Sequence, residues 1–387
     1  METARDRLAR LLDQLSAWDI GRRCAESDGL HRAALDYAKV ERLPVIFSWP
    51  QSEEQAFPPL PNDAIYGDPA AMLYNELVSA WDLSVVARGA AGAGIGDDLP
   101  ATIRPNWGTV LVASLLGGRA EQSGQNTPWI RRDDDAPIAL EAIAEADPEV
   151  AGSGWIPRVI ATYEAYRQLL APYPGLWSAL RVTLPDLQGP LDIVEQLTGA
   201  DLFIDMIERP ELAARAFDRA AELQIACARL FAPFTKDGPE GFSHQHGFMV
   251  KGKVLIRCDS AVMISPELYR DLVAPADEAV LAALGGGGLH SCGRIGHALP
   301  QMLALPSIRC FDFGQSFMNE VDLLYQQARG RRIPFLRVQP TRDELRSASI
   351  LERFPTGVSL HCPVGSMEEA RDTFDLYLSS SARTGRG

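Results

Sequence analysis

The second half of the chain alternates short apolar segments with helical ones, and this alternation restricts the fold more than any other feature. Ser265, followed by Pro266 and Glu267, is typical of a helix start, and capping boxes beginning at Thr341 and Ser366 predict two more helices. Short apolar strands that alternate with helices indicate a parallel sheet covered on both faces. We expect strands at 254–258, 288–290, 308–313, 333–338 and 358–362.

The first half has a weaker pattern of the same kind. Residues 43–49 are typical of a buried strand, 111–116 of a strand or turn inside a loop, and 177–183 of a further strand. Apolar spacing and a first-turn proline predict helices at 191–197 and 211–231.

Counted from Leu43, eight strands can be found along the chain. This number favours an α/β fold of the (β/α)8 type, a TIM barrel, over the alternative of a doubly wound open sheet. Residues 1–40 are expected to form a helical N-terminal extension, with Leu8, Leu11, Leu12 and Leu15 on one face, and residues 41–387 a single barrel domain.

Charge and composition argue against several classes of function. The chain of 387 residues has 37 Lys and Arg against 51 Asp and Glu, so its formal net charge is −14. An acidic surface repels phosphate backbones and anionic lipid, so we expect neither a nucleic-acid nor a membrane-surface role. The N-terminus lacks the apolar core of a signal peptide, no run reaches about 18 apolar residues, and six cysteines are too sparse for a disulfide framework. We therefore expect a cytoplasmic protein.

His290 and Cys292 are the clearest candidates for chemistry. Alternate side chains of an extended segment project to the same side, so both can reach one metal ion. Cys362 ends the last expected strand, and in a parallel barrel all three would lie at strand carboxyl ends, where barrel enzymes place their active sites. One nitrogen and two sulfur ligands with an open fourth position are typical of catalytic zinc. His361 should point away from Cys362, as a packing residue or one that supports the ligands. The simpler alternative is a buried cysteine beside a structural histidine.

A second group of polar residues lies just upstream. Asp259 closes a strand, and it is a candidate for a fourth metal ligand or a proton-transfer group; an aspartate that caps a helix or braces a loop is the alternative. His244 and His246 form another same-side pair. The sequence contains no P-loop, H-E-x-x-H, C-x-x-C or G-x-S-x-G motif, which disfavours nucleotide, zincin and serine-hydrolase mechanisms.

From about Ala101 onward, the chain resembles the uroporphyrinogen decarboxylase-like superfamily. Its His-x-Cys with a distant Cys is similar to the zinc motif of the branch that moves methyl groups between corrinoid proteins and thiols. The resemblance implies a TIM barrel, zinc held by His290, Cys292 and Cys362, and a methyl group passed from methylcobalamin to a thiol bound at the metal. It is carried by residues 103–108 (IRPNWG), 188–192 (QGPLD), 258–260 (CDS), 265–267 (SPE) and 290–293 (HSCG).

Other residues at expected strand ends or in loops are candidates for the substrate pocket, although each could equally be a hydrogen-bonding loop residue. The expected partners are a small thiol or methylated substrate, a corrinoid protein, and a second copy of the chain in a homodimer. The candidate pocket residues are His244, Gln245, His246, Arg294, Gln315 and Asn106.

The chain also departs from the decarboxylases of this superfamily. Their N-terminal R-Q-A-G-R signature grips acidic porphyrin side chains, whereas residues 43–51 read LPVIFSWPQ. Without that clamp, an acidic protein is poorly suited to a substrate with many carboxylates. Beside a zinc-dependent methyltransferase, two hypotheses stay open: a metal-independent decarboxylase in which Asp259 handles protons, and a barrel that binds a cobamide or tetrapyrrole without turnover.

Overall fold

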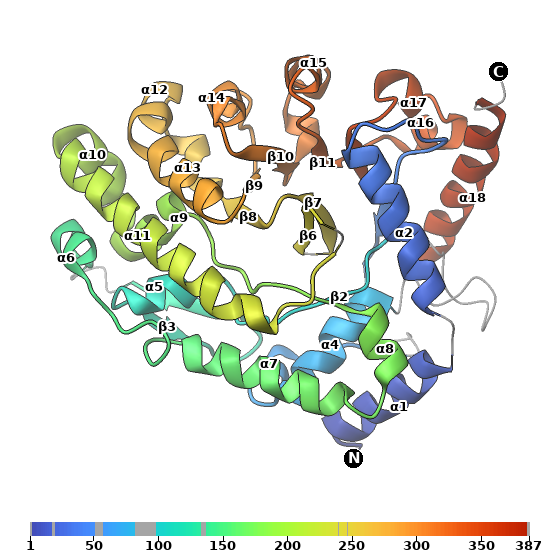
Figure 1. Ribbon diagram of the computed structural model, residues 1–387, viewed down its shortest axis with the longest axis horizontal. Helices are drawn as coiled ribbons and strands as arrows, with labels where there is room; N and C mark the ends of the chain where they lie inside the picture. Colours follow the sequence, from blue (N-terminus) through green and yellow to red (C-terminus); the bar gives the residue numbers. More distant parts are fainter. Residues whose placement is uncertain are drawn as a thin grey trace.

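The computed structural model (Figure 1) describes residues 2–17, 20–50, 57–81, 98–132, 137–238, 240–245 and 247–384. Its centre is a parallel sheet of six strands in the order β1-β12-β11-β10-β9-β8. Strands β2 and β5 form a separate parallel pair, and β3–β4 and β6–β7 are antiparallel pairs. The strands are β1 (Val45–Ser48), β2 (Thr102–Ile103), β3 (Arg119–Glu121), β4 (Trp129–Arg131), β5 (Arg181–Val182), β6 (Phe242–Gln245), β7 (Phe248–Lys251), β8 (Val254–Arg257), β9 (Gly287–Ser291), β10 (Ile308–Phe313), β11 (Phe335–Val338) and β12 (Val358–Pro363).

Helices surround these strands in an arc, with the β6–β7 hairpin toward the middle of the molecule (Figure 1). None of the helices within the described ranges is both long and apolar enough to cross a membrane. The helices are α1 (Ala4–Ser16), α2 (Ile20–Leu35), α3 (Asn62–Ile65), α4 (Pro69–Trp81), α5 (Leu111–Leu115), α6 (Leu140–Glu145), α7 (Ile156–Leu170), α8 (Pro174–Ala179), α9 (Pro190–Thr198), α10 (Asp201–Glu208), α11 (Pro210–Phe231), α12 (Pro266–Leu268), α13 (Ala274–Ala283), α14 (Leu299–Ala304), α15 (Val321–Arg329), α16 (Arg342–Ser347), α17 (Ile350–Arg353) and α18 (Met367–Thr384).

The expected α/β class and the parallel sheet of the second half are confirmed. All five strands expected there are present, and each joins its neighbour in parallel. A closed barrel is not shown, because no strand pairing among the described residues joins the β2–β5 pair to the six-stranded sheet. The expected N-terminal helices are present as α1 and α2, and the four leucines expected on one face of α1 are all buried.

Two segments of the first half differ from expectation. Residues 111–116, expected as a strand or turn, form helix α5, whose buried face packs against α9 and α11. The first three residues of 177–183, expected as a strand, complete helix α8, which Pro174 begins and which buries Leu176 and Ala179. Only Arg181 and Val182 form a strand. Short apolar runs do not distinguish strand from helix, and tertiary packing decides between them here.

The side chains of the six-stranded sheet divide between two cores. On β12, Val358, Leu360 and Cys362 belong to the main core, where the helices pack. The opposite face contacts the β6–β7 hairpin, and we call it the inner face. Its residues form a second, smaller cluster with the hairpin: Leu35, Phe242, Met249, Val250, Leu255, Cys310 and Leu336. The hairpin therefore fills much of the space that the inner face encloses.

Candidate metal centre

Asp259, His290 and Cys292 form a group that could hold a metal ion, since their ligand atoms all lie within 4.8 Å of one another. Asp259 lies two residues after the end of β8, His290 lies in β9, and Cys292 follows the last residue of β9. Because β8 and β9 are adjacent parallel strands, their carboxyl ends bring the three residues together. His290 is almost fully buried, whereas Cys292 and Asp259 are partly exposed.

The two separations measured from His290 Nε2 suit a tetrahedral metal ion. His290 Nε2 lies 3.4 Å from Asp259 Oδ1 and 3.5 Å from Cys292 Sγ. Zinc bonds of about 2.0–2.3 Å at tetrahedral angles place neighbouring ligand atoms about 3.3–3.6 Å apart. One nitrogen, one sulfur and one carboxylate oxygen are donors that zinc accepts, and three protein ligands leave a fourth position for a substrate. The donor set and its spacing therefore fit a catalytic zinc ion.

His290 is oriented from its other ring nitrogen. Its Nδ1 lies 2.9 Å from Asp312 Oδ2, and Asp312 is the register partner of His290 on the neighbouring strand β10. Arg337 of β11 donates from Nε to Asp312 Oδ1 at 2.6 Å and from Nη2 to Oδ2. A carboxylate behind a ligating histidine fixes the ring so that Nε2 faces the metal. Burial alone would raise the pKa of Asp312, but Arg337 and His290 hold it well below its usual range.

Arg337 is held in an unusual backbone conformation. Its φ of 55° lies in the left-handed region, where the register between β11 and β12 shifts. Such a conformation is unfavourable for a residue with a side chain, and it persists where the surroundings enforce it. The guanidinium carbon of Arg337 also lies 5.2 Å from the ring centroid of Phe248 in the β6–β7 hairpin. The backbone conformation, the aromatic contact and the ion pair with Asp312 together hold the guanidinium beside His290.

Asp259 is placed by the segment whose sequence is QGPLD. Asp192, in the first turn of α9, accepts hydrogen bonds from the backbone nitrogens of Asp259 at 2.8 Å and Ser260 at 2.9 Å. Gly189 lies so close to the carbonyl of Arg257 in β8 that a Cβ there would overlap it. Burial and the neighbouring Asp259 raise the pKa of Asp192 to about 6. The QGPLD and CDS segments of the resemblance are thus in direct contact.

Cys292 is held against Asp259 and the strand end of β10. Its backbone nitrogen donates to Asp259 Oδ1 at 2.8 Å, and Gly314 leaves room for its sulfur, since a Cβ at Gly314 would lie 2.7 Å from Sγ. Burial and the Asp259 carboxylate raise the pKa of the Cys292 thiol to about 11. A bound cation would oppose both effects and favour the thiolate ligand.

Cys362, the third ligand expected from the sequence, does not belong to this group. It shares the main core with Val358 and Leu360, and the charges that act on its thiol are those of Arg342 and Arg346 of α16. His361 points instead to the inner face, where its ring contacts Phe248 at 5.8 Å between centroids. Because side chains alternate along β12, Cys362 lies on the face of the sheet opposite to that of His290. Asp259 is the third donor that the structure brings to His290 and Cys292.

The candidate pocket residues that the structure describes lie in several different surroundings. Asn106 lines a cavity beside β2, and Gln245 is buried at the end of β6, next to the hairpin tip. Gln315 accepts a hydrogen bond from the backbone of Gly293 at 2.6 Å and so braces the loop after Cys292. Arg294 is exposed and lines a different cavity of about 400 Å³ beside α15. His246 lies outside the described residues.

His244, the remaining candidate, is fully buried away from the metal group. Its Nε2 lies 3.5 Å from Asp28 of α2, and its Nδ1 lies 3.5 Å from Asp237. Asp28 also binds Arg181, the first residue of β5, at 2.6 Å. Burial opposes the charged imidazole, but the two carboxylates raise the pKa of His244 above its usual value. His244 therefore ties the hairpin to α2 by charge.

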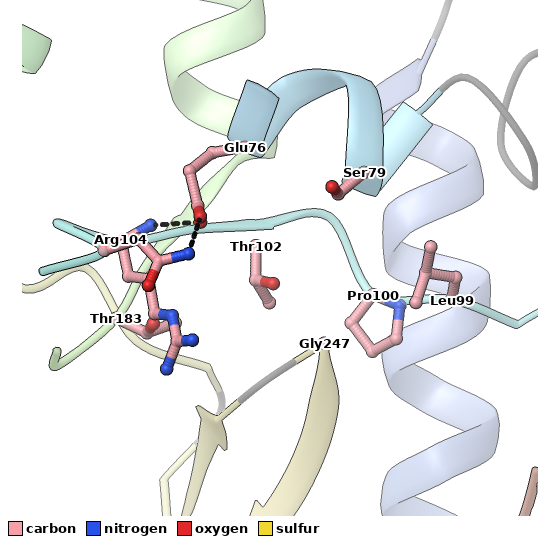
Figure 2. A pocket seen from close by; sticks show the side chains of 9 residues that line it. Glu76, Ser79, Leu99, Pro100, Thr102, Arg104, Thr183 and Gly247 are labelled. Carbon is pink, nitrogen blue, oxygen red and sulfur yellow. Dashed lines mark hydrogen bonds between the residues drawn. The ribbon is translucent and has the colours of Figure 1, made fainter. Parts of the chain in front are cut away.

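Sequence reasoning assigned no role to Asp312, Arg337, Glu76 or Arg104, although Arg104 lies in the IRPNWG segment that carries the resemblance. Asp312 could have been found, because it is a lone carboxylate near the end of an apolar strand that neighbours the strand of His290. Glu76 and Arg104 line the cavity beside β2 and meet across 28 residues of sequence, where the Arg104 backbone nitrogen donates to Glu76 Oε2 (Figure 2). The contact between these two residues depends on the tertiary fold.

Comparisons with protein-family models and with curated proteins found no match to this chain.

Proposed function

We propose that this protein is a zinc-dependent methyltransferase that moves a methyl group between a corrinoid carrier and a small thiol. The observation that supports this most is the group of Asp259, His290 and Cys292, with ligand spacings suited to zinc and Asp312 behind the histidine. The corrinoid donor follows from the resemblance of the HSCG segment to the zinc motif of that branch. Asp259 takes the place that the resemblance assigns to Cys362.

The residues of the chain hold the zinc ion, keep its ligands in position and limit the access of water. Zinc, when bound, would lower the pKa of a thiol in its open position, so that the thiolate is available near neutral pH. In the proposed transfer the thiolate sulfur bonds to the methyl carbon of methylcobalamin as the cobalt–carbon bond breaks, and the electron pair of that bond leaves with the corrinoid as cob(I)alamin. Asp312 and Arg337 keep His290 Nε2 directed toward Asp259 and Cys292. The ligand charges of Asp259 and Cys292 together balance the two positive charges of the ion. Cys292 keeps part of its surface exposed, so a substrate can reach this side of the group.

We also propose that residues 41–387 form a TIM barrel with this group at the strand carboxyl ends. Eight parallel strands are available: the six of the central sheet together with β2 and β5. Asp98, which precedes β2, donates from its backbone nitrogen to the carbonyl of Val45 in β1 at 3.1 Å. On the other side, Gly189 after β5 packs against Arg257 in β8. These contacts lie at the two places where the ring would close.

Metal analysis combined with a methyl-transfer assay tests the proposal. Protein purified without added metal should contain about one zinc ion per chain, as one such site requires. With methylcobalamin and 3-mercaptopropionate it should form S-methyl product at a rate that chelation abolishes and zinc restores. Cys292→Ala should lose the zinc ion and at least about 100-fold in rate, because a ligand is removed. Cys227→Ala, which removes a buried cysteine of α11, is the matched control and should keep both.

Three outcomes would contradict the proposal. Absence of zinc after reconstitution would exclude the metal centre. Turnover that survives chelation would favour the metal-independent decarboxylase, in which Asp259 handles protons. Tight cobamide binding without any product under single-turnover conditions would favour a binding protein.

A further inference from the structure

The turn that begins at Asp259 has no cap from its own residues. Asp259 is the first residue of the 3-10 helix η2 (Asp259–Met263), and the side chain of Cys258 before it makes no capping hydrogen bond. The first bond of this turn runs from the Ala261 nitrogen to the Cys258 carbonyl at 3.3 Å. The backbone N–H groups of Asp259 and Ser260 precede that bond, and N–H groups at the start of a helix need an acceptor from elsewhere.

Asp192 supplies that acceptor from a different element. Its carboxylate oxygens accept one bond each, Oδ2 from the Asp259 nitrogen at 2.8 Å and Oδ1 from the Ser260 nitrogen at 2.9 Å. Asp192 is only 4% exposed and lies in the first turn of α9, which begins where Gly189 approaches the carbonyl of Arg257. Breaking this contact would leave buried polar groups without partners, which is costly.

The cap from α9 leaves the Asp259 side chain to face β9. An aspartate at the start of a helix commonly accepts hydrogen bonds from the backbone of its own turn. At η2 the two N–H groups already bind Asp192. The Oδ1 atom of Asp259 instead accepts from the Cys292 nitrogen at 2.8 Å and lies 3.4 Å from His290 Nε2.

We propose that Asp192 is a positioning residue for the metal group: by capping η2 in place of Asp259, it keeps the Asp259 carboxylate directed at His290 and Cys292. The inference rests on the proposed function, because it takes Asp259 to be a metal ligand. Without Asp192, the N–H groups of Asp259 and Ser260 would compete for the nearest carboxylate, that of Asp259 itself. The metal ion would then keep only His290 and Cys292 as protein ligands.

Cobalt(II) in place of zinc tests the inference, because its absorption spectrum reports the number and kind of its ligands. Asp192→Asn keeps the size of the side chain but replaces one acceptor by a donor. Its cobalt spectrum should match that of Asp259→Asn, with absorption from the Cys292 thiolate present in both. Zinc affinity, measured by chelator competition, should fall about 10- to 100-fold, as for other residues that orient a ligand. Asp192→Ser, which keeps one acceptor, should lose less.

A double variant separates positioning from the loss of a negative charge. If Asp192 acts through Asp259, Asp192→Asn should have no further effect on zinc affinity once Asp259→Asn is present. Asp277→Asn is the matched control, because Asp277 is also fully buried and accepts a hydrogen bond from the Tyr269 hydroxyl at 2.8 Å. This control should lose stability in urea and keep the zinc affinity and cobalt spectrum of the wild type.

A wild-type cobalt spectrum for Asp192→Asn would overturn the inference, as would an equal loss of zinc affinity with and without the Asp259 carboxylate. If Asp192→Asn does not fold, Asp192→Ser provides both comparisons. A wild-type chain that takes up neither zinc nor cobalt would contradict the proposed function. Metal uptake that needs Asp259 but is indifferent to Asp192 would contradict this inference alone.

Discussion

Two of the buried histidines in the described part of the chain, His290 and His244, each lie between carboxylates, one of which pairs with an arginine. His290 lies between Asp312, which Arg337 neutralises, and the pair of Asp259 and Cys292. His244 lies between Asp28, which Arg181 neutralises, and Asp237. Two differences separate them. The second nitrogen of His290 meets an oxygen and a thiol, whereas that of His244 meets a carboxylate alone. In addition, Arg337 Nη2 lies 2.7 Å from His290 Nδ1.

This comparison shows which surroundings distinguish a metal ligand from a structural cation. With a carboxylate on each ring nitrogen, His244 gains from being protonated, and a protonated ring has no lone pair for a metal. His290 uses one nitrogen toward Asp312 and turns the other toward two further donor atoms. A carboxylate behind a buried histidine is therefore not evidence of a metal site until a third donor, such as Cys292, lies in front of it.

The largest difference between the surroundings of His290 and those of His244 is expected in zinc affinity, when the carboxylate behind each histidine is replaced. Asp312→Asn should lower zinc affinity about 10- to 100-fold, because the carboxylate fixes the ring of His290. Competition with a chromophoric chelator measures this affinity. Asp28→Asn makes the same change behind His244 and should leave zinc affinity unchanged. Equal losses in both variants would mean that they act through general destabilisation.

A second difference is the pH dependence of stability. His244→Gln should lower the free energy of unfolding by about 3 kcal/mol near pH 6, because it leaves Asp28 and Asp237 without their shared partner. The pKa of His244 is raised in the folded state, so its contribution is complete below the unfolded value of about 6.5 and is lost as pH rises through the folded value. Urea unfolding of zinc-saturated protein from pH 6 to 9 should show the gap between wild type and variant narrowing. A gap that widens with pH would refute the charged role of His244.

The smallest effect is expected at Cys362. Cys362→Ala removes one buried sulfur from the main core and should lower stability by about 1 kcal/mol. Its zinc content should equal that of the wild type, in contrast to Cys292→Ala. Loss of zinc from this variant would restore Cys362 as a ligand and remove that role from Asp259.

The sequence allowed the regular part of the fold to be predicted, because a sustained pattern of apolar residues favours one type of local structure. The strand expected at 308–313 matches β10 to the residue, and the helix expected at 211–231 matches α11 except for Pro210. Segment 111–116 was misassigned because six apolar and small residues carry no period. The two-residue strand β5 was too short to separate from the helix before it.

The sequence predicts those parts of the candidate site whose residues lie close together in the chain or on adjacent strands. His290 and Cys292 are two residues apart on one strand, so their alternation was sufficient, and Asp259 follows the adjacent strand. To place Cys362, one has to know which residues of β12 share the face of the sheet on which His290 of β9 lies. The β12 sequence VSLHC contains that information, since Cys362 lies on the same face as Leu360 and Val358. Arg337 was not predictable, because its direction depends on a register shift and a left-handed backbone.

That left-handed backbone is a local cost that the ion pair between Arg337 and Asp312 has to offset. Glycine would adopt the φ of Arg337 without strain, and asparagine with less than arginine, so either replacement would relieve the backbone. Each would also remove the guanidinium that holds Asp312 behind His290. An unpaired buried carboxylate costs about 3–5 kcal/mol, more than the about 1–3 kcal/mol that relief of the backbone would return, so stability as well as the metal group favours the arginine at this position.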